Sequence, residues 1–160
     1  GAPIDERGRK TLSWLYMRDM NIQARAIGKY LAKYKSTDFG LDPVYAVDEV
    51  KPLPTFPKCP DAVLPGLKKV WSSQGTFGEN ETPKVAVGEF EALDGESVAA
   101  LAVNMDLGSS VRVVFDKLEG FSTLILVSPV DGSETVLDEK DIEYGTWILP
   151  GHGALFVWKK

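Results

Sequence analysis

The 160-residue sequence is poor in cysteine and histidine, with one of each, Cys59 and His152. A lone cysteine excludes a disulfide within the chain. Cys59 has no neighbouring base that would make its thiol reactive. A catalytic Ser–His–acid triad would have to use His152, but the chain has no G-x-S-x-G motif. Gly151 and Gly153 flank His152 in a pattern typical of a tight turn.

The chain also lacks a basic excess and a long apolar run. Its 18 Lys and Arg residues are outnumbered by 23 Asp and Glu residues, and the net charge is −5. Nucleic acids and anionic membrane surfaces attract basic faces, so we expect neither as a partner. No apolar run reaches the ~18–20 residues of a membrane span, and no leader pattern predicts a signal peptide. A single cysteine does not decide the redox compartment. A longer protein that contains this chain could be secreted or periplasmic.

What the sequence does contain is a series of short apolar segments, rich in Val, Leu and Phe, between turn signals over residues 67–160. The spacing predicts strands over 67–73, 84–93, 97–104, 110–116, 123–128, 134–137, 146–149 and 154–158. No helical period inside 84–160 links them as parallel strands. This pattern is typical of an antiparallel β-sandwich or barrel.

Alternation along these strands predicts which side chains face the core. In the strand over 84–93 the apolar positions change parity near Gly88, where we expect a bulge or sharp bend. The predicted core residues are Leu101, Val103, Val113, Phe115, Leu126 and Phe156.

Residues 9–35 have a helical period instead. Apolar side chains recur on one stripe, and charged side chains mostly fall outside it, which predicts a long amphipathic helix. We expect 36–38 and Gly40 to end the helix. The stripe consists of Leu12, Tyr16, Met20, Ile27, Leu31 and Tyr34, with Trp14, Leu15, Ala24 and Tyr30 at its edges.

Six prolines in residues 39–66 exclude a central strand there and predict an extended connector. The fold class we expect is therefore mainly β: an antiparallel β-sandwich with one long N-terminal α-helix and a Pro-rich connector. The expected units are a linker helix over 1–38, the connector over 39–66 and the sandwich over 67–160.

Several of these segments resemble a known family. The run VGEF…DG…ALAVNMD…SSVRVVF, followed by ILPGHGALFVW, is similar to the C-terminal β-sandwich domain of glycoside hydrolases with a (β/α)8 catalytic barrel. The helix and the segment KSTD…VY look like the link that follows the barrel in such proteins. The resemblance implies an accessory domain whose catalytic carboxylates lie in another domain, so no catalytic residue is assigned here.

The acidic residues suggest no site. Glu89 and Glu91 are two apart on a strand, so they share a flat face instead of flanking a cleft, as glycosidic hydrolysis requires. The acidic residues over 138–143 are expected in a solvated loop, and they lack an EF-hand pattern. We therefore expect no structural metal and no cofactor.

The aromatic residues are the stronger functional signal, because sugars stack their C–H faces on exposed rings. The candidate carbohydrate-binding residues are Trp71, Tyr144, Trp147 and Trp158, with Phe77 nearby in the sequence. The alternative, that these tryptophans belong to the core or to a domain interface, stays open.

Three functions follow from these observations. The first is a non-catalytic accessory domain that braces a catalytic barrel, with the helix as the joint between the two domains. In the absence of a barrel, a homodimer partner would cover the apolar side chains of the helix. The second is a carbohydrate-binding module that uses exposed aromatic rings. The third, a small stand-alone enzyme, has the least support in the sequence.

Overall fold

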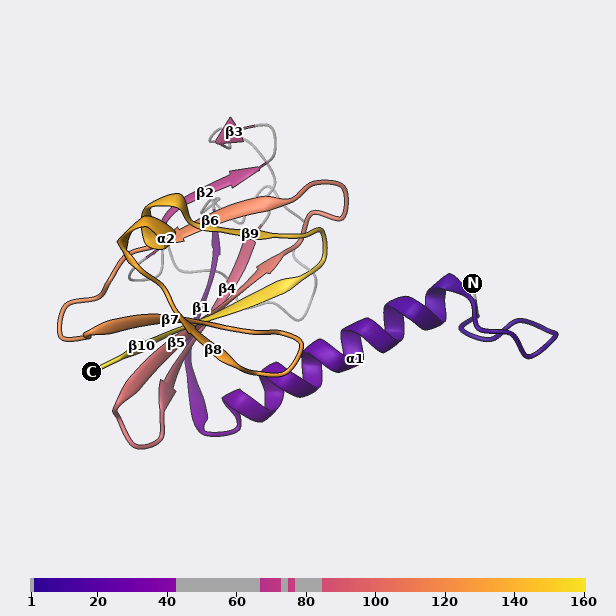
Figure 1. Cartoon of the computed structure of the whole chain (residues 1–160), viewed down its shortest axis with the longest axis horizontal. Helices are drawn as coiled ribbons and strands as arrows, with labels where there is room; N and C mark the ends of the chain where they lie inside the picture. The colour runs from indigo at the N-terminus through magenta and orange to yellow at the C-terminus, as the bar shows by residue number, and fades with distance from the viewer. Residues whose placement is uncertain (1, 43–66, 73–74, 77–84) are drawn as a thin grey trace.

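The computed structural model describes residues 2–42, 67–72, 75–76 and 85–160, with side chains for 2–37 and 85–160 (Figure 1). The predicted connector beyond Asp42, Cys59 and Phe77 lie outside the described residues.

The first helix or strand along the chain is one long helix, α1 (Leu12–Leu31), which has no proline and a single glycine, Gly28. The helix is shorter than predicted, because the chain leaves it after Leu31 and forms strand β1 (Tyr34–Asp42). Strand β1 pairs along its whole length with strand β4 (Val85–Ala92). These pairings satisfy the backbone N–H and C=O groups that a longer helix would have used. The predicted boundary between 38 and 39 therefore falls inside a strand.

Ten strands form two antiparallel sheets in the described part of the chain. The larger sheet has the order β1-β4-β5-β10-β7-β8. Its other members are β5 (Ser97–Asn104), β7 (Thr123–Val127), β8 (Glu134–Val136) and β10 (Gly153–Lys159). The smaller sheet has the order β3-β2-β6-β9. It consists of β2 (Leu67–Ser72), β3 (Gly75–Thr76), β6 (Val111–Phe115) and β9 (Thr146–Ile148).

One buried cluster includes residues of both sheets. From the larger sheet it takes the apolar side chains of β4, β5, β7 and β10, and from the smaller sheet those of β6 and β9. At its centre the ring of Phe115 lies 4.6 Å from that of Phe156 and 5.4 Å, edge-on, from that of Trp158, measured between centroids. The mainly β, antiparallel fold class is confirmed, and the β-sandwich as such stays a prediction.

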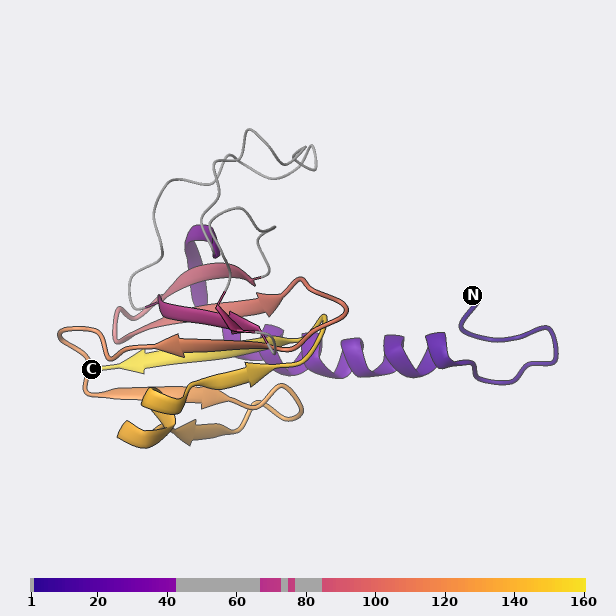
Figure 2. The same ribbon diagram turned by 90° about the horizontal axis from the view of Figure 1, so that it is seen from above.

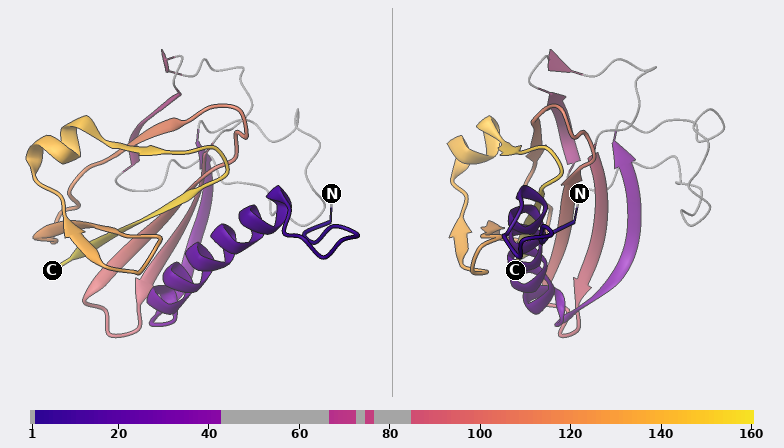
Figure 3. Two further views of the ribbon diagram at one scale, coloured as in Figure 1. Left: turned by 45° about the vertical axis from the view of Figure 1, so that its right-hand side comes forward. Right: turned by 90° about the vertical axis from the view of Figure 1, so that its right-hand side faces the viewer.

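A second cluster covers the other face of the larger sheet, where α1 packs (Figures 2 and 3). Ile27 is the only residue of α1 that is buried by its own chain. It packs in a cluster with Ala99, Ile125, Val127, Leu155 and Val157. The larger sheet is therefore covered on both faces, by the smaller sheet and by the helix.

This double burial explains which core predictions hold. Val113, Phe115 and Phe156 are buried in the core between the sheets as predicted, and Leu126 packs against it. Leu101 instead packs in the helix-side cluster, and Val103, two residues on, shares its face. The small residues Ala100 and Ala102 face the core in their place. Alternation cannot reveal the inner face of a strand that is buried on both sides.

Of the bulge or sharp bend that was predicted at Gly88, the bulge is wrong. Strand β4 pairs with β5 in continuous register from Val85 to Glu91, and the irregularity lies in β1, between Ser36 and Asp38. Gly88 instead makes room for an aromatic ring, since a Cβ there would lie 3.3 Å from the ring of Phe90.

The acidic stretch that was expected to be a loop forms a short helix, α2 (Glu139–Tyr144). Asp138 Oδ1 accepts from the Asp141 backbone N–H at 2.8 Å, and Asp141 Oδ2 accepts from that of Asp138 at 3.3 Å. This reciprocal capping box holds the first turn together. None of the described helices is long and apolar enough to span a membrane.

Candidate functional site

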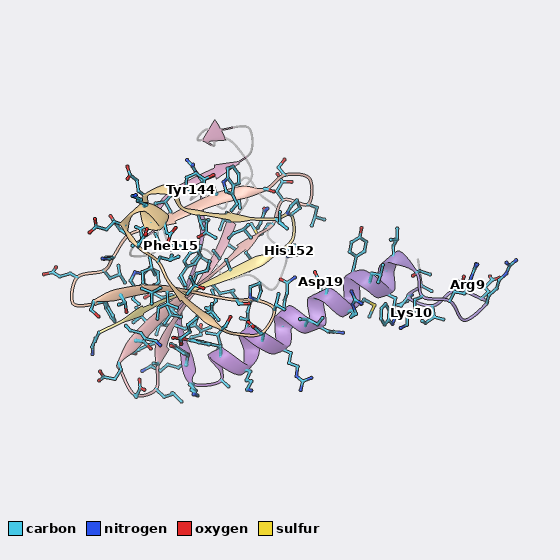
Figure 4. All side chains as sticks on the ribbon, in the orientation of Figure 1. Arg9, Lys10, Asp19, Phe115, Tyr144 and His152 are labelled. Atoms are coloured by element: carbon cyan, nitrogen blue, oxygen red, sulfur yellow. The ribbon has the colours of Figure 1, made fainter. Side chains whose placement is uncertain are left out.

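Two of the residues that were considered for catalysis, Glu91 and His152, contact side chains of other elements. Glu91 pairs with Lys35 at 2.9 Å, and among the described residues no group of three or more His, Cys, Asp and Glu side chains could hold a metal ion. His152 occupies the tight turn that was predicted, with Gly151 at a φ of 70°. Its Nδ1 lies 3.1 Å from the side-chain nitrogen of Gln23 and its Nε2 lies 4.0 Å from Asp19 of α1 (Figure 4). His152 therefore links the β9–β10 turn to the helix.

Trp158 is excluded as a carbohydrate-binding residue. Its side chain is 1% exposed and lies in the core, and its indole N–H donates to the carbonyl of Asp116 at 2.8 Å. On β10, an interior strand of the larger sheet, Trp158 faces the core between the sheets, whereas its neighbour Val157 packs in the helix-side cluster. The alternative interpretation, a core tryptophan, is correct for this residue.

Two other predicted aromatic residues come together around an arginine that the sequence did not single out. Arg112 of β6 lies with its guanidinium carbon 5.5 Å from the ring centroid of Tyr144 and 5.8 Å from that of Trp147. Both distances are typical of cation–π contacts. Tyr144 is 62% exposed and Trp147 is 42% exposed. We call these three residues the aromatic–arginine cluster.

The local structure that builds this cluster centres on Gly145. It follows the last residue of α2 and adopts a φ of 79°. A Cβ at this position would lie 2.5 Å from the carbonyl oxygen of Val113, so only glycine allows the chain to approach β6 so closely. The chain then enters β9, where Trp147 pairs directly with Arg112. Tyr144 and Trp147 thus flank the same arginine.

Trp71, the fourth predicted residue, is placed by its backbone only. Its Cα pairs with that of Arg112 across β2 and β6, and Arg112 pairs in turn with Trp147 across β6 and β9. Trp71, Arg112 and Trp147 therefore occupy one row across the smaller sheet. The sequence identified the aromatic members of this row, but not the arginine, because the strand order was unknown.

A second surface is the N-terminal half of α1, which extends beyond the sheet (Figure 1). The stripe that meets the sheet at Ile27 continues toward the N-terminus through Met20, Tyr16 and Leu12, at helical spacing. These three residues are 67%, 67% and 69% exposed. We call residues 12–22 the exposed helix segment.

The exposed helix segment also has apolar side chains outside the stripe. Leu15, Met17 and Ile22 are 42%, 50% and 41% exposed. A shallow groove of about 370 Å³ on this side includes Pro3 and Trp14, with Arg18 and Arg25 at its edge. An apolar helix surface of this width is normally buried. Among the described residues, Pro3 and Lys10 lie beside Trp14 and His152 lies near Asp19, and most of the apolar surface stays exposed.

Comparison of the chain with known protein families, with curated proteins and with solved structures found no match. The resemblance to glycoside-hydrolase C-terminal domains therefore rests on the sequence motifs alone.

Proposed function

We propose that this chain is a non-catalytic accessory domain of a glycoside-hydrolase-like protein, which braces a catalytic (β/α)8 barrel through the exposed helix segment. The observation that carries the proposal is the continuous apolar stripe of α1. Its C-terminal half is covered by the domain's own sheet, and its N-terminal half is not. One rigid helix that is covered by two bodies fixes their relative position.

The energetics favour such a contact. Burying a large apolar side chain contributes about 1.5–3 kcal/mol, and the exposed helix segment has several such side chains. A homodimer through this segment is the other way to cover it, because a second copy presents the same apolar surface.

The test compares this chain with the longer protein that includes the preceding domain. Hydrogen exchange of the amides of residues 12–22 is measured in both. We expect slower exchange in the longer protein, and a triple variant, Leu12→Ser with Tyr16→Ser and Met20→Ser, should remove the difference. Lys29→Ala, on the covered half of the helix, is the matched control. Equal exchange in both proteins would contradict the bracing role.

Light scattering on the chain alone separates the two ways of covering the segment. A dimer that the triple Ser variant converts to a monomer indicates self-association. A monomer at all concentrations, together with protection in the longer protein, supports the barrel as the partner.

The aromatic–arginine cluster favours a second function, carbohydrate binding. Its two exposed rings present apolar faces, and a guanidinium beside them supplies hydrogen-bond donors for sugar hydroxyls. Affinity electrophoresis of the chain in glycan-containing gels tests this function. Retardation that Trp147→Ala abolishes, and that the control Val136→Ala leaves intact, supports it. Unchanged mobility in every glycan contradicts it.

The proposal also means that the chain by itself is not an enzyme. Screening the purified chain with chromogenic glycosides should release no chromophore. Turnover of any of them would favour the stand-alone enzyme instead.

A further inference from the structure

A cavity of about 530 Å³ lies on a different part of the molecule from both surfaces described above. Its walls come from the C-terminal half of α1, the β4–β5 turn, the β7–β8 turn and the end of β10. At Gly132 the β7–β8 turn comes close to the helix, since a Cβ there would lie 3.6 Å from the carbonyl oxygen of Ala26. We call this cavity the tyrosine trough. Its volume is in the range of small-molecule sites.

Tyr30 of α1 and Tyr34, the first residue of β1, line the trough with their rings. The rings of Tyr30 and Tyr34 are stacked, with centroids 5.9 Å apart and planes at 22°. Tyr34 Oη and Ser97 Oγ are hydrogen-bonded at 2.8 Å. Tyr30 Oη donates to Glu134 at 2.7 Å. Both rings are therefore fixed in place before any ligand arrives, which lowers the entropic cost of binding.

Glu134 is held by more than the tyrosine. Lys159 Nζ donates to its two carboxylate oxygens at 2.9 and 2.7 Å. Burial, followed by the hydrogen bond to Glu134, raises the pKa of Tyr30 far above its ordinary value. The phenol therefore keeps its proton at neutral pH.

The rest of the trough is lined by charges of both signs. Four lysines and four acidic residues line it, so their formal charges cancel. Within the described residues, the side chains of Lys29, Lys33 and Glu96 form no salt bridge and no hydrogen bond. These three groups are exposed, and they offer donors and an acceptor to a ligand. The lysines are Lys29, Lys33, Lys159 and Lys160, and the acidic residues are Asp94, Glu96, Asp131 and Glu134.

We propose that the tyrosine trough binds a neutral saccharide of one or two rings. Its hydroxyl groups can donate to carboxylates and accept from ammonium groups, and the C–H face of a sugar ring can lie on a tyrosine. A ligand with a net charge of either sign meets as many repelling as attracting charges. This site is separate from the aromatic–arginine cluster, and neither depends on the other.

The test is an amide chemical-shift titration of the full chain with glucose, galactose, mannose, xylose, maltose and cellobiose at millimolar concentrations. We expect at least one sugar to shift the amides of 29–34, 94–97, 131–134 and 159–160. The double variant Lys33→Ala with Glu96→Ala should weaken that binding about a hundredfold, because it removes two hydrogen bonds to charged groups. Both positions are exposed, so the variant should fold.

Matched controls separate this site from the proposed functions. The double variant Lys140→Ala with Glu143→Ala, on α2, and the variant Trp147→Ala should bind the sugar as the wild type does. Glucuronate and glucosamine should bind no more tightly than glucose. Shifts confined to 112, 144 and 147, no shift with any sugar, an unaffected Lys33/Glu96 variant, or tighter binding of glucuronate would each overturn the proposal.

Discussion

Asn104 and Ile148 belong to different sheets, and the amide Nδ2 of Asn104 donates to the carbonyl of Ile148 over 3.1 Å. The same nitrogen donates to the carbonyl of Ser109 at 2.8 Å, and Oδ1 accepts from the backbone N–H of Asp106 at 2.9 Å. With a side chain that is 1% exposed, Asn104 joins β5, the turn that follows it and β9. A buried amide is tolerated because both of its ends are hydrogen-bonded.

Replacing this residue should therefore destabilise the fold. We expect Asn104→Ala to lower the free energy of unfolding by about 1–3 kcal/mol, because it leaves buried backbone groups without their partners. Urea denaturation measures the change, with the exposed Asn21→Ala as the control. Equal midpoints for the two variants would show that the link between the sheets contributes no stability.

Phe115 tests the core between the sheets. It is 2% exposed and contacts two aromatic rings, so Phe115→Ala should cost about 3–5 kcal/mol through lost burial and a residual cavity. The matched substitution Val136→Ala, at a residue that is 60% exposed, should change stability by less than about 0.5 kcal/mol. A loss below about 1 kcal/mol for Phe115→Ala in denaturant melts would contradict its place in the core.

The carboxylate of Glu134 makes stability depend on pH. Hydrogen bonds from Lys159 and Tyr30 hold the pKa of Glu134 below its ordinary value of 4.5. At pH values between the folded and the unfolded pKa of Glu134, the unfolded chain binds more protons than the folded chain. The contribution of Glu134 to the free energy of unfolding is therefore complete above pH 4.5 and disappears as the pH falls through the lowered pKa. Melts between pH 7 and pH 3 should show a smaller loss of melting temperature in Glu134→Gln than in the wild type. Identical losses would contradict this account.

The acidic residues of α2 cap their own helix, so no metal is needed to hold them. A chelator should leave the melting temperature unchanged, whereas Asp138→Ala should cost about 1 kcal/mol by removing the cap. Thermal melts with and without EDTA measure the first effect, and Glu143→Ala is the control for the second. A fall of several degrees in EDTA would reopen a calcium site.

The sequence predicted the features that depend on local pattern. Alternation and turn residues placed nearly every strand, and the Gly-flanked turn at His152 is confirmed. It did not predict that Tyr34–Asp42 continues as a strand, because only pairing with the distant β4 stabilises that conformation. The sequence did not predict the acidic helix α2 for a different reason. Its capping residues are acidic, and a cluster of acidic residues is also typical of a solvated loop.

The candidate site shows the same limit. Tyr144 and Trp147 were predicted from residue type, but Arg112 became part of their site only through the pairing of β6 with β9. Trp147 and Trp158 are both tryptophans, so residue type gives the same prediction for each of them. Only the position of Trp158 on an interior strand of the larger sheet shows that it belongs to the core. Residue type therefore identified candidates, and strand order decided between them.

The position of β10 has a consequence for biosynthesis. It is made after the other strands that the structure describes, yet it separates β5 from β7 and supplies Leu155 and Val157 to the face on which α1 packs. While the ribosome is still adding residues 153–159, β7 and β8 have no partner in the rest of their sheet, and the helix has no complete surface to cover. The helix α1 must therefore wait, with its apolar side chains accessible to chaperones, until β10 has been synthesised.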